Sequence, residues 1–226
     1  MMKVSDVREY FKSELESSRV TVDRGGNETI EMLGESFIAD EPAIFGTPNQ
    51  DYIDREIEWY KSESTNVNDI EGETPKAWVM TGNDHGEINS NYGHLIWSNK
   101  YYNQYEQVIG ELERNPNSRR AQMIYNRPSV WLEATENGKN DFICTNAVTY
   151  YIRDNKVHCV VQMRSNDVIF GYKNDYAWQL FVLHKLTNKL NYRRSVLNES
   201  THLEVGDIHW QVMNLHVYGR HFHLVK

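Results

Sequence analysis

A four-residue polar turn between two β-rich segments constrains the fold of this chain more than any other feature. Residues 142–152 and 156–164 are rich in β-branched and aromatic side chains, which is typical of strands. The turn Arg153-Asp154-Asn155-Lys156 between them predicts an antiparallel hairpin. In a symmetric hairpin with this turn, Cys144 faces Ser165 on the partner strand. We therefore expect an antiparallel strand pair that carries a thiol near its open end.

Composition limits what surrounds this hairpin. The chain has 226 residues, 39% of them hydrophobic, which is enough for one substantial core, and we expect a single domain over residues 1–226. Two cysteines are too few for a disulfide framework, which favours a reducing cytoplasm. No apolar run is long enough for a transmembrane helix, and the N-terminus lacks the apolar segment of a signal peptide. The net charge of −8 argues against broad nucleic-acid binding, so an anionic substrate would need a local cluster of arginines.

Hydrophobic spacing predicts both helices and strands along the chain. Helices are expected at residues 4–15, 50–62, 101–112 and 180–190. Further strands are expected at residues 29–39, 122–132 and 208–217, with polar connections at residues 63–75 and 191–206. The sequence contains no internal repeat and no composition shift that would mark a domain boundary. These features indicate a mixed α/β (α+β) fold.

Cys144 is a candidate nucleophile because the hairpin register brings a cation beside it. Arg164 is one residue from the position that faces the thiol, and a nearby cation lowers a thiol pKa and so favours the thiolate. Cys159 lies in mid-strand between Val157 and Val161, where a small core side chain is the ordinary interpretation. A Cys/His hydrolase is the rival interpretation for Cys144, but the sequence carries no signature of that class.

Two glutamates of the predicted helix 50–62 lie on opposite faces. Glu56 has aromatic and aliphatic neighbours one turn away in both directions, whereas Glu58 has charged and polar neighbours there. Burial raises the pKa of a carboxyl group toward the range that suits acid–base catalysis. The pattern therefore favours Glu56 as an acid–base group, and the alternative is a buried glutamate held by a backbone amide.

Several short motifs occur in a consistent order along the chain. Arg164-Ser-Asn-Asp167 follows Cys144, Asn117-Ser-Arg-Arg120 follows Asn115-Pro116, and His216-Val-Tyr218 lies near the C-terminus. This set resembles the motifs of the thymidylate synthase superfamily over nearly the whole chain. The resemblance implies a thymidylate synthase-like fold, in which a large mixed β-sheet packs with helices, and a homodimer joined sheet to sheet.

The resemblance also implies a role for each matching residue. Cys144 would attack C6 of a pyrimidine nucleotide, Glu56 would act as general acid–base, and Tyr92 would help to remove the C5 proton. The nucleotide would be bound by Arg24, Arg164, Ser165, Asn166, His216 and Tyr218, and by Arg119 and Arg120 donated across the dimer interface. The co-substrate 5,10-methylenetetrahydrofolate would contact Trp78, Asp167 and Glu56.

Asp175 bears on the choice of pyrimidine. Thymidylate synthases have an asparagine at the matching position, which suits uracil, whereas an aspartate resembles the deoxycytidylate hydroxymethylases of bacteriophages. A carboxylate accepts a hydrogen bond from the cytosine amino group and shares a proton with N3, but it faces O4 of uracil with its own lone pairs. Such a buried mismatch costs on the order of 1–3 kcal/mol. The alternative is that Asp175 caps the following helix, a task that Asn174 could also perform.

The resemblance, together with Asp175, implies an enzyme that transfers a one-carbon unit to C5 of dCMP and adds water, giving 5-hydroxymethyl-dCMP in the cytoplasm of a phage-infected bacterium. Two alternatives stay open. One is a thymidylate synthase or hydroxymethylase that acts on dUMP, and the other is an inactive nucleotide-binding regulatory homodimer. The family match at Arg119 and Ser165 favours a deoxyribonucleotide. Membership of a larger nucleotide-synthesis complex stays open.

The C-terminal end carries two further expectations. Its histidines lack an acidic or cysteine companion in the sequence, so no metal site is expected at His209, His216, His221 and His223. The chain ends at Lys226, and the C-terminal tail that closes over folate in the superfamily is therefore not expected.

Overall fold

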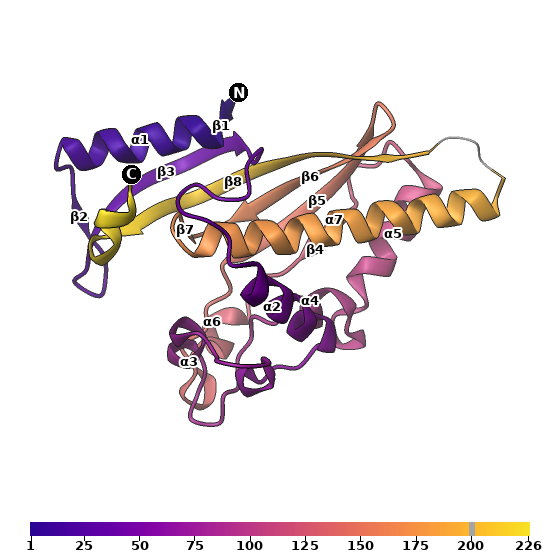
Figure 1. The fold of residues 1–226 in the computed structure, drawn as a ribbon. Coiled ribbons are helices and arrows are strands. Elements are labelled where there is room, and N and C mark those ends of the chain that lie inside the picture. Colours follow the sequence, from indigo (N-terminus) through magenta and orange to yellow (C-terminus); the bar gives the residue numbers. More distant parts are fainter. Residues whose placement is uncertain (199–201) are drawn as a thin grey trace. The chain divides into compact units, whose positions relative to one another are not determined.

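The computed structural model of the protein describes residues 1–198 and 202–226 (Figure 1). The chain divides into two compact units: residues 1–48 with 150–226 form unit 1, and residues 49–149 form unit 2. Strand β5 (Thr145–Arg153) runs through the second boundary. A single domain over residues 1–226 stays a prediction.

Unit 1 is built on a mixed sheet. Its strands, in the order in which they pair, are β1 (Met2–Lys3), β3 (Glu28–Ile38), β8 (Glu204–Tyr218), β6 (Lys156–Met163) and the C-terminal end of β5. β8 pairs antiparallel with β3 and parallel with β6. Two short strands, β2 (Thr21–Val22) and β7 (Asn166–Asp167), pair with β3 and β8. The expected mixed sheet is confirmed.

Helix α7 (Gly171–Val196) packs along strands β6 and β8 of this sheet (Figure 1). The rings of Tyr172 on the helix and Trp210 on β8 meet edge to face at 5.2 Å. Helix α1 (Val4–Glu16) packs on β3, and a 3₁₀ segment, η4 (Gly219–Leu224), follows β8. Each fully buried apolar side chain in these contacts stabilises the unit by about 1.5–3 kcal/mol.

The predicted hairpin is confirmed. Strands β5 and β6 are neighbours, and they are joined by Asp154 and Asn155. The φ angles of these two residues are 50° and 59°, the left-handed values that a two-residue type I′ turn requires. Aspartate and asparagine tolerate this conformation better than other residues with a side chain.

The first strand of the hairpin is shorter than expected. It begins at Thr145 rather than at residue 142. The carboxylate of Asp141 accepts hydrogen bonds from the backbone N–H groups of Asn89 and Ser90, at 2.6 and 2.8 Å. The segment before Thr145 is thus held by a loop of unit 2 instead of a strand.

Unit 2 consists mainly of helices. Its elements are α2 (Gln50–Ser62), η1 (Val67–Asp69), α3 (Lys76–Thr81), α4 (Tyr92–Trp97), η2 (Asn99–Tyr101), α5 (Gln104–Arg114), β4 (Gln122–Ile124), α6 (Val130–Glu133), η3 (Glu136–Gly138) and the first part of β5. Asn49, Asn91 and Asn103 accept backbone N–H groups at the starts of α2, α4 and α5, as N-caps do. β4 pairs antiparallel with β5.

Helices α2 and α4 approach each other closely at a glycine. A Cβ atom at Gly93 would lie 1.8 Å from the carbonyl oxygen of Tyr60, so no larger residue fits there. The adjacent Tyr92 stacks its ring on that of Tyr60 at 5.3 Å. This contact fixes Tyr92, a predicted site residue, against the helix that carries Glu56.

The bounds of several predicted segments are wrong in part. The strand expected at 122–132 ends at Ile124, because Pro128 lacks an N–H for sheet pairing and Val130 begins α6. The connection expected at 191–206 is helical up to Val196 and joins β8 from Glu204, while residues 199–201 lie outside the described residues. The helix expected at 180–190 is therefore only the middle of α7.

Within the described ranges, no helix combines the length and the apolar character needed to cross a membrane.

Candidate active site

Glu56 lies on the buried face of α2, as predicted, and only 5% of it is exposed. Its Oε1 accepts hydrogen bonds from the Tyr52 hydroxyl and from Trp78 Nε1, the latter at 2.9 Å. Trp78 Nε1 also lies 2.9 Å from the Tyr52 hydroxyl oxygen. Both partners are side chains, so the alternative of a glutamate held by a backbone amide is wrong.

Burial raises the pKa of Glu56, and the hydrogen bonds from Tyr52 and Trp78 oppose that rise in part. Glu58, in contrast, is exposed and pairs with Lys61 at 2.6 Å. The two glutamates therefore differ as expected, and the pKa of Glu56 is shifted in the direction that suits acid–base catalysis.

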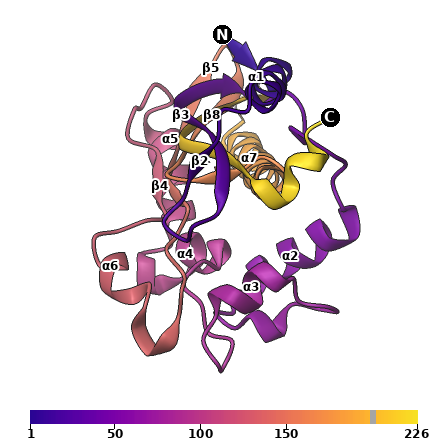
Figure 2. The same ribbon diagram turned by 90° about the vertical axis from the view of Figure 1, so that its left-hand side faces the viewer.

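Tyr52 was not predicted as a site residue from the sequence. It lies one helical turn before Glu56, the spacing at which two side chains meet on one helix face. A tyrosine four residues before a buried glutamate was the available signal. Trp78 comes from α3, which lies alongside α2 in unit 2 (Figure 2), with the Trp59 and Trp78 rings 5.1 Å apart.

Cys144 is half-buried and directly precedes β5. Its Sγ lies 3.9 Å from the carbonyl oxygen of Phe142. The next residue, Thr145, is buried and donates a hydrogen bond from Oγ1 to the hydroxyl oxygen of Tyr92 at 3.0 Å. Two predicted site residues of unit 2, Cys144 and Tyr92, are thereby linked through Thr145.

Cys159 has no exposed surface, and burial raises the pKa of its thiol far above the ordinary value. Its interpretation as a core side chain is confirmed, and its thiol stays protonated. The two cysteines therefore differ in exposure, and Cys144 is the accessible one.

The predicted phosphate arginines lie in turns. Arg119 and Arg120 are exposed, and the turn before them is held by Ser118, whose Oγ donates to Glu111 at 2.5 Å and accepts the Arg120 N–H at 3.1 Å. Arg24 is exposed in the turn between β2 and β3. Exposed guanidinium groups on structured turns can reach a phosphate or a second chain.

The Arg164-Ser-Asn-Asp167 segment leads from β6 into α7. Arg164 and Ser165 are half-buried, and Asn166 with Asp167 forms strand β7. The Asp167 carboxylate accepts the backbone N–H groups of Ile169 and Phe170, each at 3.0 Å. Asp167 therefore orders the turn that starts α7.

Asp175 lies inside α7, which begins at Gly171. The proposal that Asp175 or Asn174 caps this helix is therefore wrong, because both residues follow its first turn. Asp167 already binds backbone N–H groups just before the helix, so no cap is needed at 174 or 175. Asp175 Oδ2 instead accepts a hydrogen bond from Asn166 Nδ2 at 2.7 Å.

His216 and Tyr218 lie at the C-terminal end of β8. His216 is buried, and their rings meet edge to face at 4.9 Å. Burial lowers the pKa of His216, while the charge of Asp167 opposes this shift. A neutral imidazole beside a tyrosine hydroxyl can hydrogen-bond a sugar hydroxyl group.

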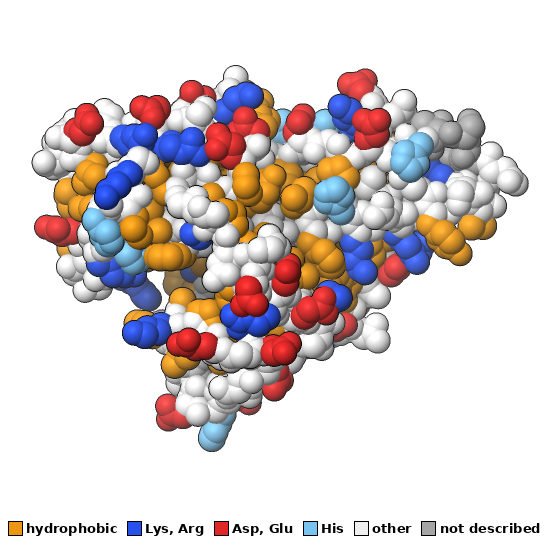
Figure 3. All heavy atoms as spheres, viewed as in Figure 1, with side chains coloured by type: hydrophobic (Ala, Val, Ile, Leu, Met, Phe, Trp, Pro, Cys, Tyr) orange, Lys and Arg blue, Asp and Glu red, His pale blue; other side chains and the backbone are white. Residues whose placement is uncertain are grey.

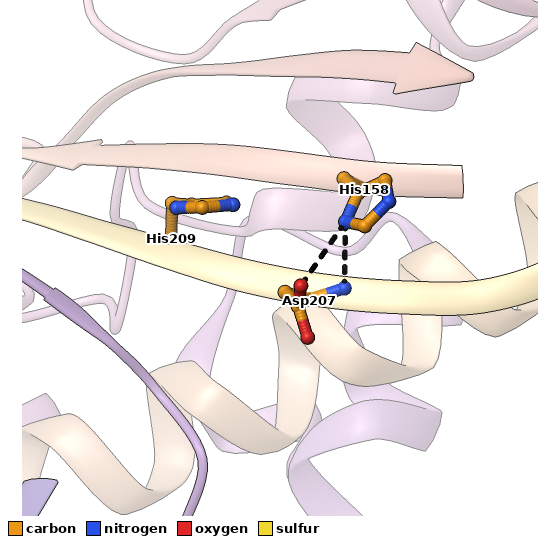
Figure 4. Close-up of side chains that lie close together, drawn as sticks. All are labelled: His158, Asp207 and His209. Atoms are coloured by element: carbon orange, nitrogen blue, oxygen red, sulfur yellow. Dashed lines mark hydrogen bonds and ion pairs between the residues drawn. The ribbon is translucent and has the colours of Figure 1, made fainter. Parts of the chain in front are cut away.

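His209 belongs to a different cluster from the other C-terminal histidines (Figure 4). It lies near His158 and Asp207, and the three side chains offer ligand atoms within 4.8 Å of one another. His158 Nδ1 accepts the backbone N–H of Asp207 at 2.9 Å, which occupies that lone pair. The register between β6 and β8 that brings these residues together was not readable from the sequence, and the expected absence of a metal stays a prediction.

Charges of both signs are interspersed on the face drawn in Figure 3. In and just after α1, for example, Lys12 pairs with Glu9 and Arg19 with Glu14.

Comparisons with known proteins agree with this arrangement. The family model described as thymidylate synthase matches residues 15–226. The chain is 52% identical to a deoxycytidylate 5-hydroxymethyltransferase of Enterobacteria phage T4 over 225 residues, which cover 99% of this chain and 89% of the relative. The protein of the same name from Enterobacteria phage T6 is 51% identical over 224 residues, with the same coverage. The crystal structure of thymidylate synthase from T4 phage superimposes with a TM-score of 0.74 at 22% identity, covering 96% of this chain and 77% of that one, which is a likeness of fold.

Proposed function

Because this chain belongs to the thymidylate synthase family, we propose that it transfers a one-carbon unit from 5,10-methylenetetrahydrofolate to C5 of dCMP. Water then adds to the transferred carbon, so that the products are 5-hydroxymethyl-dCMP and tetrahydrofolate. The observation that carries the proposal is the 52% identity, over 99% of the chain, to a phage protein named for this reaction. The aspartate at position 175 supports the choice of cytosine.

Asp175 recognises the base by hydrogen-bond complementarity. Its carboxylate accepts a hydrogen bond from the exocyclic amino group and shares a proton with N3, whereas uracil would oppose it with O4. Protonation at N3 also withdraws electrons from C6, which favours attack by a thiolate. Asp175 therefore both selects and activates the base.

Cys144 is the nucleophile in this proposal. Its thiolate adds to C6, and the electron pair of the C5–C6 bond moves to C5, which then attacks the one-carbon unit that methylenetetrahydrofolate supplies when bound. Tyr92 assists removal of the C5 proton, and loss of this proton with departure of tetrahydrofolate leaves an exocyclic methylene group on C5. Water adds to the resulting exocyclic methylene group, and release of the Cys144 sulfur from C6 restores the aromatic base.

Glu56 handles the proton transfers with ordered water. Burial raises its pKa, which favours the protonated form, and the hydrogen bonds from Tyr52 and Trp78 both go to Oε1, so we assign Oε2 to substrate or water. Trp78 is half-buried, and the next two residues, Val79 and Met80, are exposed. An apolar surface beside an acid suits the flat heterocycle of a folate, and we assign Trp78 and Asp167 to folate binding.

We assign the remaining predicted site residues to the phosphate and the sugar of the nucleotide. The positive charges assigned to the phosphate are those of Arg24 and Arg164 with Ser165, and of Arg119 and Arg120 from a partner subunit. His216 and Tyr218 bind the 3′-hydroxyl group, and the family match at Arg119 and Ser165 favours a deoxyribonucleotide 5′-phosphate. The working enzyme is then a homodimer in which each active site borrows arginines from the other chain.

The proposed setting is the cytoplasm of an infected bacterium, since the relatives reported above come from phages. There the enzyme would consume free dCMP, and association with other enzymes of nucleotide synthesis is compatible with this role.

The decisive experiment is the product mass after incubation with dCMP and methylenetetrahydrofolate. We expect the mass of dCMP plus one CH₂O unit, without the absorbance change of dihydrofolate formation. Formation of dihydrofolate with dUMP would identify a thymidylate synthase, and CH₂O addition to dUMP alone would identify a uridylate hydroxymethylase. Binding of dCMP without any turnover would support the inactive regulatory homodimer.

A further inference from the structure

Asn166 and Asp175 form a side-chain pair within unit 1. Asn166 Nδ2 donates a hydrogen bond to Asp175 Oδ2 at 2.7 Å. An ionised carboxylate can only accept hydrogen bonds, so the NH₂ group of Asn166 must face it, and the carbonyl oxygen of Asn166 must point elsewhere. The pair therefore fixes the orientation of both side chains.

The carbonyl oxygen of Asn166 is a buried acceptor. Asn166 is only 4% exposed, and its Oδ1 has no hydrogen-bond partner among the described residues. Native proteins rarely leave a buried polar atom unpaired, because such an atom has lost its water without replacement. An unpaired buried acceptor beside a predicted base-binding carboxylate points to a donor that the ligand supplies.

Three backbone features hold the pair in place. Asn166 pairs with Leu215 in the β7–β8 ladder, and the Val168 N–H donates to the His216 carbonyl oxygen at 2.9 Å. Gly171, the first residue of α7, leaves space for the pair, because a Cβ there would lie 3.3 Å from Asn166 Nδ2. A side chain pinned in this way from a strand can act as a rigid recognition group.

We propose that Asn166 is a specificity-determining residue for the pyrimidine base, an inference that rests on the function proposed above. Its amide N–H holds the Asp175 carboxylate in the orientation that meets cytosine, and its carbonyl oxygen accepts the second N–H of the exocyclic amino group. Uracil carries O4 at that place, so two acceptors would face each other without a proton between them. Asn166 and Asp175 thus reject uracil together.

The test compares dCMP with dUMP for Asn166→Ala and Asn166→Asp. For Asn166→Ala we expect kcat/KM for tritium release from C5-labelled dCMP to fall about ten- to a hundredfold, with a much smaller change for dUMP. Asn166→Asp keeps the shape but replaces the donor by a second carboxylate, so its loss should be at least as large. If Asn166 served only in packing, Asn166→Asp would be nearly as active as the unmodified chain and Asn166→Ala would lose more activity. Both substrates would then be affected equally.

Gln50→Ala is the matched control, because Gln50 Nε2 donates to Asp54 Oδ1 over the same distance of 2.7 Å on an exposed helix face. This substitution should leave kcat/KM unchanged for both dCMP and dUMP. Calorimetric binding of dCMP and dUMP without folate gives a second readout, in which Asn166→Ala should lose its preference for dCMP. An unmodified chain that does not turn over dCMP would overturn the proposed function. An active chain whose base preference survives both Asn166 substitutions would overturn this inference alone.

Discussion

Thr145, the residue after Cys144, donates a hydrogen bond to the hydroxyl oxygen of Tyr92 at 3.0 Å. Through this bond α4 is tied to the first residue of β5, next to the proposed nucleophile. Tyr92 is also fixed from its other side by stacking on Tyr60. The position of the segment that carries Cys144 therefore depends on an aromatic hydroxyl group assigned to removal of the C5 proton.

Tyr92→Phe keeps the stacked ring but removes this hydrogen bond. We expect turnover of dCMP to fall at least about tenfold, because the buried Thr145 hydroxyl loses a partner worth on the order of 1 kcal/mol and the proton-transfer step loses a hydroxyl group. Tritium release from C5 measures the effect. Tyr10→Phe, which removes a bond to the Glu31 carbonyl oxygen at 3.0 Å, is the control, and equal turnover of the two variants would refute the assignment.

Trp78→Phe removes the indole N–H that Glu56 and Tyr52 share. Because this N–H lowers the pKa of Glu56, its loss should raise that pKa and move the ionisation seen in the pH profile of kcat to higher pH. We also expect kcat/KM to fall about tenfold. Trp59→Phe is the matched control, since Trp59 Nε1 donates to the Asn66 carbonyl oxygen at 3.0 Å. The pH profile of kcat should be unchanged in this variant.

Glu56→Gln tests the raised pKa through stability. A carboxyl group whose pKa is higher in the folded state holds its proton more tightly there, so its stabilising effect is complete below the ordinary value of 4.5 and declines as pH rises toward the folded value. The unmodified chain should therefore lose up to about 1.4 kcal/mol of unfolding free energy per pH unit in this window, relative to Glu56→Gln. Urea unfolding at a series of pH values measures the difference.

The difference in unfolding free energy between the two proteins reports the titration of Glu56 alone. Burial also raises the pKa of Asp141, but this residue is present in both proteins and cancels in the difference. Parallel stability curves for the two proteins would mean that Glu56 titrates normally.

Mixed dimers test whether active sites borrow arginines. Cys144→Ser and the double variant Arg119→Ala/Arg120→Ala should each be inactive. After unfolding and refolding together in equal amounts, half of the dimers are mixed and contain one intact site, so about a quarter of the normal activity should return. Each variant refolded alone is the control, and no recovery in the mixture would show that each chain uses its own arginines.

Features that depend on a local side-chain pattern could be predicted from the sequence. Asp154 and Asn155 determine the hairpin turn by their own tolerance of left-handed backbone angles. Glu56 could be placed on a buried face because its neighbours one turn away are apolar. Cys159 could be assigned to the core because its strand neighbours are valines.

Structure that depends on hydrogen bonds outside such a pattern could not be predicted from the sequence. The start of α7 resembles a loop, with Gly171, Asn174 and Asp175 close together, yet the helix begins there because Asp167 binds the backbone just before it. The pairing of Asn166 with Asp175 follows from that shift and could not be read from spacing alone. At the other end of α7, Asn191 exchanges two hydrogen bonds with the backbone of Leu203, a contact that no periodicity predicts.

The burial of Cys159 offers a measure of sample quality. Of the two cysteines, only Cys144 has exposed surface in the folded protein. A maleimide reagent should therefore label one thiol per native chain at neutral pH and two after denaturation. The ratio of the two labelling yields would report the fraction of folded chains in any preparation, independently of substrate. Pre-incubation with a nucleotide that shields Cys144 would convert the same labelling reaction into a binding assay.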